Sequence, residues 1–99
     1  LLTDRLGELQ ARRDMMVDGL NAAGLACPVP DGAFYVFPKC PENMPSDPEF
    51  CRYLLDTAGV AVVPGRAFGM PGHLRLSFAY GRESLQQGLA RITGAVQAL

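Results

Sequence analysis

The stretch that decides the fold is Leu74-Arg75-Leu76-Ser77-Phe78-Ala79. Apolar side chains alternate along it with small or charged ones, and a period of two is typical of a β-strand that buries one face. Its leucines and Phe78 are therefore expected to point into a core. Arg75 is expected on the opposite face, beside two small residues. Such a strand needs partner strands at its edges and a layer of helices against its apolar face.

Two shorter stretches predict the partner strands. Residues 33–37 form a β-branched and aromatic run that is closed by Pro38, and residues 60–63 have the composition of a buried strand stopped by Pro64-Gly65. The connection between residues 63 and 74 is long enough for either a hairpin or a crossover. We favour an antiparallel pairing of these two strands.

Helical periodicity appears at both ends of the chain. Residues 3–23 predict a helix that ends near Gly24, and residues 83–98 predict another. Each carries one apolar stripe with spacings of three, four or seven, which means that one side faces a core. The stripes are formed by Leu2, Leu6, Leu9, Met16 and Leu20 in the first helix, and by Leu85, Leu89, Ile92, Val96 and Leu99 in the last.

A third helix is predicted between the first two strands and ends at Gly59. Asp47 is expected as its N-cap, with Pro48 at the first helical position. Alternatively, Ser46 and Glu49 form a capping box. The order of elements is then helix, strand, helix, strand, strand, helix. It predicts an α+β domain in which helices pack on one face of a small three-stranded, mainly antiparallel sheet.

The composition fits a single globular domain over residues 1–99. Hydrophobic residues make up 48% of the 99 residues and charged residues 19%, a balance unlike that of disordered chains. A net charge of −1 argues against partners such as nucleic acid or an anionic membrane surface. No apolar run approaches the ~18 residues of a membrane span, and no signal-peptide pattern is present. We expect a cytoplasmic protein whose cysteines are reduced thiols.

Arg75 is the main candidate for chemistry. A guanidinium on a rigid strand presents a planar fork of donors that matches a carboxylate in two parallel hydrogen bonds. Small neighbours at Ser77 and Ala79 leave room above it. The alternative is an ordinary arginine on the solvent face of a half-buried sheet. Phe34 and Tyr35 either line a pocket or belong to the core.

Other residues suggest no catalytic or metal site. The glycine-rich loop of residues 65–72 matches neither the Walker pattern nor the dinucleotide-binding fingerprint. Its glycines are therefore expected to serve positive φ angles and close backbone approach. Lys39, the single lysine, lies beside a proline-rich loop, and we reject it as a cofactor anchor. The three cysteines are widely and irregularly spaced, which argues against a zinc site or a disulfide framework.

Taken together, four segments in order resemble the C-terminal part of class I/II aminotransferases, the fold type I superfamily of aspartate aminotransferase. Each segment is weakly specific, but the four together span nearly the whole chain. They are Arg12-Arg13-Asp14, Pro30-Asp31-Gly32-Ala33-Phe34-Tyr35, Gly59-Val60-Ala61-Val62-Val63-Pro64-Gly65 with Phe68-Gly69, and Gly72 with Leu74-Arg75-Leu76-Ser77-Phe78-Ala79.

The resemblance implies a role for two residues. Arg75 matches the family's arginine that binds the substrate α-carboxylate, and Phe34 lies in a segment near the pocket for the substrate side chain. It also implies that residues 1–99 are a small C-terminal domain which closes over an amino-acid or 2-oxo-acid substrate. The large domain, with the Schiff-base lysine and the pyridoxal-phosphate site, has no counterpart in this chain. We expect a homodimeric parent and a fragment that alone binds no cofactor and is inactive.

Two alternatives to a transaminase stay open. One is a pyridoxal-phosphate-dependent lyase or synthase of the same fold, in which the same arginine would hold the carboxylate. The other is a free-standing α+β binding or regulatory module, including the effector domain of a pyridoxal-type transcription regulator.

Overall fold

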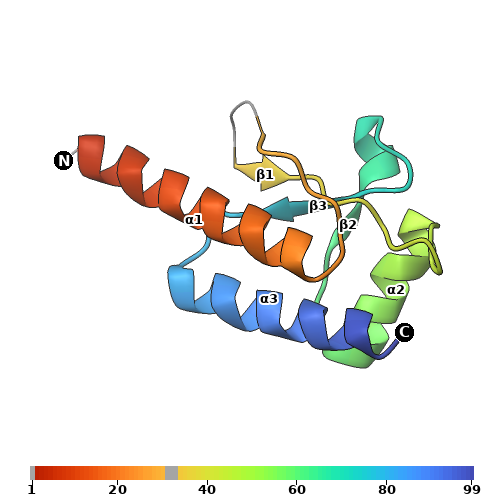
Figure 1. Cartoon of the computed structure of the whole chain (residues 1–99). Coiled ribbons are helices and arrows are strands. Elements are labelled where there is room, and N and C mark those ends of the chain that lie inside the picture. The colour runs from red at the N-terminus through yellow and green to blue at the C-terminus, as the bar shows by residue number, and fades with distance from the viewer. Residues whose placement is uncertain (1, 31–33) are drawn as a thin grey trace.

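The computed structural model describes residues 2–30 and 34–99, with side chains from residue 7 onward. The described part of the chain contains three α-helices, three short strands and one 3₁₀ turn (Figure 1). In chain order these are α1 (Leu2–Ala22), β1 (Tyr35–Val36), α2 (Asp47–Ala58), β2 (Val63–Pro64), η1 (Gly65–Phe68), β3 (Leu74–Ser77) and α3 (Arg82–Gln97). This confirms the predicted α+β class and the predicted order of elements.

The sheet is built around β3, the strand with the clearest sequence pattern. The strand order is β1-β3-β2, and both pairings are antiparallel. Tyr35 lies opposite Ser77 across one edge of β3, and Val63 lies opposite Arg75 across the other. The antiparallel pairing of β2 with β3 is therefore confirmed.

The predicted buried strand at residues 60–63 is wrong in extent and burial. Only Val63 and Pro64 pair with β3, and the Val63 side chain is 37% exposed. The reason lies at the end of α2, where Gly59 adopts a left-handed φ of +68° and the Val60 N–H donates to the Leu54 carbonyl at 3.2 Å. The chain leaving the helix is thus occupied by helix-terminal hydrogen bonds before it reaches β3.

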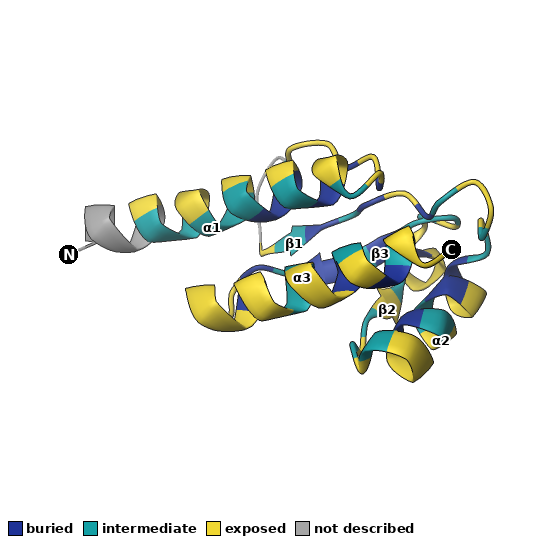
Figure 2. Ribbon diagram, turned by 60° about the horizontal axis from the view of Figure 1, so that its bottom comes forward, coloured by how far each residue is buried: buried dark blue, intermediate teal, exposed yellow. Residues whose placement is uncertain are grey.

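Helices α1 and α3 lie side by side across one face of the sheet, and α2 packs against α3 and β2 (Figures 1 and 2). The buried side chains face this layer, as the strand pattern predicts. Leu74 and Leu76 from β3 meet Leu20 from α1 and Ile92 from α3. The apolar stripe of α3 is confirmed for Leu85, Leu89, Ile92 and Val96, whereas Leu99 is partly exposed. No helix in the described ranges is long and apolar enough to cross a membrane.

The start of α2 differs from both predictions for its cap. Ser46 occupies the N-cap position and makes no side-chain cap bond, and Asp47 is the first helical residue. The Asp47 carboxylate points away from its own helix because it accepts hydrogen bonds from the loop of residues 65–72. The helix begins one residue earlier than an Asp47 cap requires, and the carboxylate serves a tertiary contact.

Candidate anion-binding site

Arg75 lies in the middle of the central strand, on the face opposite the helices. Its neighbours Leu74 and Leu76 are buried toward α1 and α3, whereas Arg75 itself is only partly buried. The register places Val63 beside it on β2. Because β3 is hydrogen-bonded on both sides, the backbone that carries the guanidinium is held by the sheet.

Two aromatic rings contact the Arg75 guanidinium. The Cζ atom lies 4.2 Å from the ring centroid of Tyr35 and 4.0 Å from that of Phe68. Tyr35 belongs to β1, and Phe68 ends the η1 turn that follows β2, so the rings approach from opposite sides of β3. Contacts within about 6 Å of a centroid are attractive cation–π interactions. We refer to Arg75, Tyr35 and Phe68 as the Arg75 cluster.

The guanidinium is held by contacts that use none of its hydrogen-bond donors. No side-chain hydrogen bond and no ion pair joins Arg75 to another residue within the described ranges, whereas Arg12, Arg13, Arg66 and Arg82 each pair with a carboxylate there. The planar guanidinium carries five N–H donors and cannot lose its charge in a protein. A cation fixed in this way is suited to receive an anion from another part of the protein or from solution.

A hollow of about 230 Å³ lies next to this cation. Arg75, Tyr35 and Ser77 line it from the sheet, but most of its lining comes from residues 60–63, from α3 and from the helix-facing side chain of Leu76. The hollow combines apolar walls with one charged group, the arrangement in which a small ligand is oriented by a few polar contacts. At about 230 Å³ the hollow is smaller than the roughly 300–1,000 Å³ of typical ligand pockets, so it has room for a very small ligand or for part of a larger one.

Phe34 lies elsewhere in the same segment. Its ring is 49% exposed and stands 6.5 Å, centroid to centroid, from Phe78, which is buried on the helix-facing side of the sheet. The aromatic residue of this segment that contacts Arg75 is its neighbour, Tyr35. The role of Phe34 as a substrate contact stays a prediction.

The glycine-rich loop has the backbone geometry that the sequence predicts. Gly69 and Gly72 have φ angles of +76° and +77°. A Cβ on Gly65 would come within 2.5 Å of the Met70 carbonyl oxygen and 2.6 Å of the His73 carbonyl oxygen. Sequence reasoning missed that this loop brings Phe68 to Arg75. It also missed that Asp47 binds the loop, because a helix-start aspartate is usually read as a cap.

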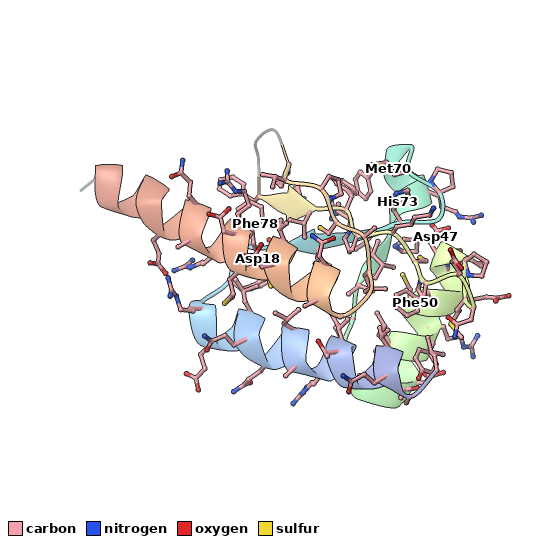
Figure 3. The ribbon with its side chains drawn as sticks, viewed as in Figure 1. Asp18, Asp47, Phe50, Met70, His73 and Phe78 are labelled. Atoms are coloured by element: carbon pink, nitrogen blue, oxygen red, sulfur yellow. The ribbon has the colours of Figure 1, made fainter. Side chains whose placement is uncertain are left out.

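The surroundings of the three cysteines and of His73 leave them no evident catalytic role; Figure 3 labels His73, on the side of the molecule that also carries Met70. Burial raises the pKa of all three free thiols to about 11, so they are poor nucleophiles at neutral pH. The His73 ring nitrogen Nδ1 lies 3.1 Å from the Pro71 carbonyl, to which it can only donate. Within the described ranges, no three His, Cys, Asp or Glu side chains are grouped to hold a metal ion.

A Schiff-base cofactor does not fit the residues of this chain. Lys39 is the only lysine, and it is exposed at a single β-bridge with His73, outside the hollow beside Arg75. A lysine that forms an imine needs a desolvated or electropositive setting that lowers its pKa. The amine would therefore have to come from another part of the protein.

Comparison with known proteins gives one consistent result. Residues 2–92 match the family described as aminotransferase class I and II. The chain is 43% identical over 99% of its length to an aspartate aminotransferase of Rhizobium meliloti, and 45% identical over 87% of its length to a probable aspartate/prephenate aminotransferase of Thermus aquaticus. It covers 27% and 22% of those proteins. The chain thus spans about a quarter of the length of the relatives it matches.

Solved structures agree with the sequence matches. The crystal structure of the Rhizobium meliloti aspartate aminotransferase superposes on 97% of this chain with a TM-score of 0.91 at 43% identity. An aromatic aminotransferase from Pyrococcus horikoshii OT3 gives the same TM-score at 34% identity. The chain covers 27% and 26% of those two structures.

Proposed function

Because the chain belongs to the class I and II aminotransferases, a pyridoxal-phosphate-dependent family, we propose that it is the small C-terminal domain of a transaminase. The parent enzyme would transfer an amino group between an amino acid and a 2-oxo acid, with aspartate-type or broad specificity. The proposal draws on relatives about four times as long as this chain, several of them aspartate aminotransferases. The parent is proposed to be a cytoplasmic homodimer in which a large domain holds the cofactor.

The observation that carries the proposal is the state of Arg75. Its guanidinium is fixed by a central strand and two aromatic rings, and it has no carboxylate partner within the described ranges. We propose that it binds the substrate α-carboxylate through two parallel hydrogen bonds. Such a clamp removes rotational freedom from the substrate and so orients its Cα–H bond for deprotonation.

Phe34 is proposed to lie near the substrate side chain. Its half-exposed ring stands beside the buried Phe78 ring, so its outer surface is available for contact with apolar parts of a ligand or of the large domain. This role is independent of the carboxylate clamp, since Phe34 is not part of the Arg75 cluster.

The 99-residue chain alone is expected to be inactive. It contains one lysine, which lies outside the candidate site, so it provides no imine-forming amine there. Its contribution to the parent would be substrate binding, orientation and exclusion of water when the small domain closes.

The experiment that tests this function uses the purified native gene product. It would be assayed with pyridoxal phosphate and a panel of amino acids paired with 2-oxo acids, and both new products would be quantified. Equal amounts of a new amino acid and a new 2-oxo acid are expected. Release of ammonia or of a side-chain fragment, without amino transfer, would instead indicate a lyase. No turnover would favour a binding or regulatory module.

A further inference from the structure

Asp47 is a buried carboxylate that is hydrogen-bonded to a loop distant from it in the sequence. Its side chain is 0% exposed. It accepts hydrogen bonds from the Arg66 guanidinium at 2.8 and 3.0 Å, from the Arg66 backbone N–H at 3.1 Å and from the Gly72 N–H at 3.2 Å. The Arg66 side-chain bonds are the main reason that the pKa of Asp47 lies well below its usual value. A buried carboxylate is tolerated only when it is paired and hydrogen-bonded in this way.

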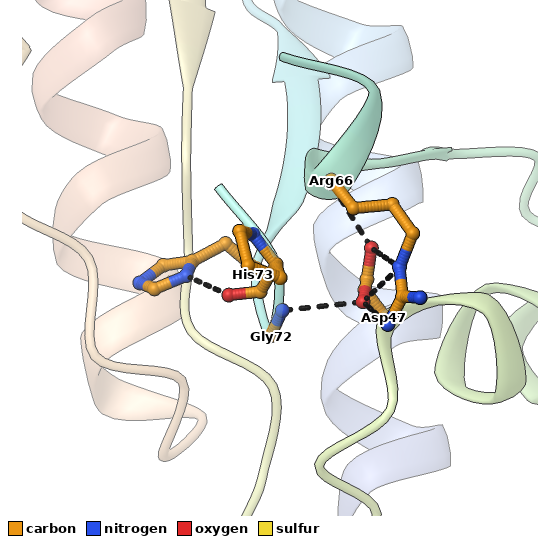
Figure 4. Close-up of polar contacts among 5 residues, drawn as sticks. Asp47, Arg66, Gly72 and His73 are labelled. Atoms are coloured by element: carbon orange, nitrogen blue, oxygen red, sulfur yellow. Dashed lines mark hydrogen bonds and ion pairs between the residues drawn. The ribbon is translucent and has the colours of Figure 1, made fainter. Parts of the chain in front are cut away.

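The two backbone donors lie near opposite ends of the glycine-rich loop. Arg66 follows Gly65, whose N–H donates to the His73 carbonyl at 2.7 Å and so closes the neck of the loop. Gly72 stands at the other end. Figure 4 shows the Asp47 carboxylate reaching from the start of α2 to both of these positions. One side chain from α2 therefore holds both ends of the loop.

The same loop carries the Phe68 ring to Arg75. The ring is 48% exposed, so core packing alone does not fix it. Its centroid nevertheless lies 4.0 Å from the Arg75 Cζ atom. With half of the ring in solvent, the backbone that holds Phe68 has a large part in deciding where the ring stands.

From these contacts we infer that Asp47 is a positioning residue for the Arg75 cluster. By holding residues 66 and 72 together, it keeps Phe68 over the guanidinium and limits the directions in which the N–H donors of Arg75 can point. The inference rests on the proposed function of Arg75 and adds to it a residue from α2. Loss of Asp47 is expected to let Phe68 move away from the guanidinium and so to weaken carboxylate binding, while Arg75 itself stays in place on β3.

The test is a double-mutant cycle in the native gene product. The variants Asp47→Asn, Phe68→Leu and the double variant are compared by KM and kcat for the preferred amino acid. Each single variant is expected to raise KM roughly two- to fivefold, the size of one part-exposed cation–π contact, with kcat changed less. The double variant is expected to raise KM no more than the larger single effect, because both changes remove the same contact.

Two controls separate positioning from general loss of stability. Tyr53→Phe removes the hydrogen bond from the Tyr53 hydroxyl to the Ala95 carbonyl, 2.7 Å long, which joins α2 to α3 far from the loop. It is expected to lower stability and leave KM unchanged. Should Asp47→Asn fail to fold, Arg66→Gln replaces it: the Arg66 side chain is 55% exposed and its backbone donor remains. It removes the guanidinium bonds to Asp47 but leaves the two backbone bonds, so KM is expected to rise in the same direction by a smaller factor than in Asp47→Asn.

The possible outcomes are distinct. Additive effects of the two substitutions on KM, or an equal rise in KM in Tyr53→Phe, would overturn the positioning role. Arg75→Lys is measured alongside. If it raises KM and the Asp47 and Arg66 variants do not, only this inference fails. If Arg75→Lys also leaves KM unchanged, or if no turnover is found, the proposed function of Arg75 fails with it.

Discussion

Replacing Asp47 by alanine should destabilise the domain strongly, although Asp47 is one of several acidic residues in α2. In the folded chain its fully buried carboxylate satisfies two backbone N–H groups and the Arg66 side chain. Removing it leaves two partly buried donors without an acceptor, and each such group costs about 1–3 kcal/mol. The half-exposed Arg66 side chain can be solvated by water in the variant, so the loss of its ion pair adds little to the destabilisation. The two donors together would cost about 2–6 kcal/mol, and because both are only partly buried we expect the free energy of unfolding to fall by the lower part of that range, roughly 2–4 kcal/mol.

The matched control is an exposed carboxylate in the same helix. Asp56 is 68% exposed and lies 3.8 Å from the Arg52 guanidinium, which is 83% exposed. A solvent-exposed pair of this kind contributes at most about 0.5 kcal/mol, so Asp56→Ala should change stability little. Urea unfolding of the chain, followed by circular dichroism at pH 7, would measure both variants.

The effect of Asp47 should also depend on pH in a defined direction. Hydrogen bonds from Arg66 hold its folded pKa well below the unfolded value of about 3.9, so the folded state favours the ionised form. The stabilisation is then fully present above about pH 5 and is lost as the pH falls below the unfolded pKa toward the folded one. The difference in free energy of unfolding between wild type and Asp47→Ala should therefore decrease as the pH falls from about 5 to about 2. Equal stabilities of the Asp47 and Asp56 variants at pH 7, or a gap that does not change with pH, would refute this reasoning.

Two further predictions concern the loop and the thiols. Gly65→Ala should lower the free energy of unfolding by about 1–3 kcal/mol, because its Cβ would lie 2.5 and 2.6 Å from backbone carbonyl oxygens. The control is Gly88→Ala in α3, where nothing lies within 4 Å of the new Cβ, and it should raise the free energy of unfolding by up to about 1 kcal/mol. Urea unfolding would measure both variants, and equal changes in the two would contradict this reasoning. Because burial raises the pKa of all three thiols to about 11, labelling by a chromogenic disulfide at pH 7.5 should be slow and should accelerate with pH. Rapid labelling of any cysteine in the folded chain at neutral pH would show that its thiol is accessible and ionised.

The spacing of apolar residues and the composition of each segment predict much of the architecture. The alternation in residues 74–79 identifies the central strand and the outward face of Arg75; both are confirmed, although the strand ends at Ser77 and not at Ala79. The helical stripes identify the side of α3 that faces the sheet, and that of α1 for Leu9, Met16 and Leu20, whereas the side chains of Leu2 and Leu6 lie outside the described residues. These features are local: each follows from the direction in which consecutive side chains point.

Features that depend on tertiary contacts are not visible in the sequence. Residues 60–62 have the composition of a strand, but the Val60 N–H donates to the Leu54 carbonyl at the end of α2, and the strand begins only at Val63. Asp47 has the position of a helix cap, but its carboxylate belongs to the loop of residues 65–72. Phe68 reaches Arg75 only because that loop folds back along β3. For Asp47 and Phe68, a residue with a common local role has a stronger partner in another element of the fold.

The central claim is that Arg75 binds the substrate α-carboxylate, and kcat/KM of the native gene product tests it most directly. Arg75→Ala should lower kcat/KM for the preferred amino acid by about 30-fold to several thousand-fold, corresponding to about 2–5 kcal/mol for a desolvated charge pair. The control Arg91→Ala, an exposed arginine of α3, should change it less than about twofold. If Arg75→Ala is as mild as Arg91→Ala, Arg75 is an ordinary surface arginine, and the substrate carboxylate is bound elsewhere.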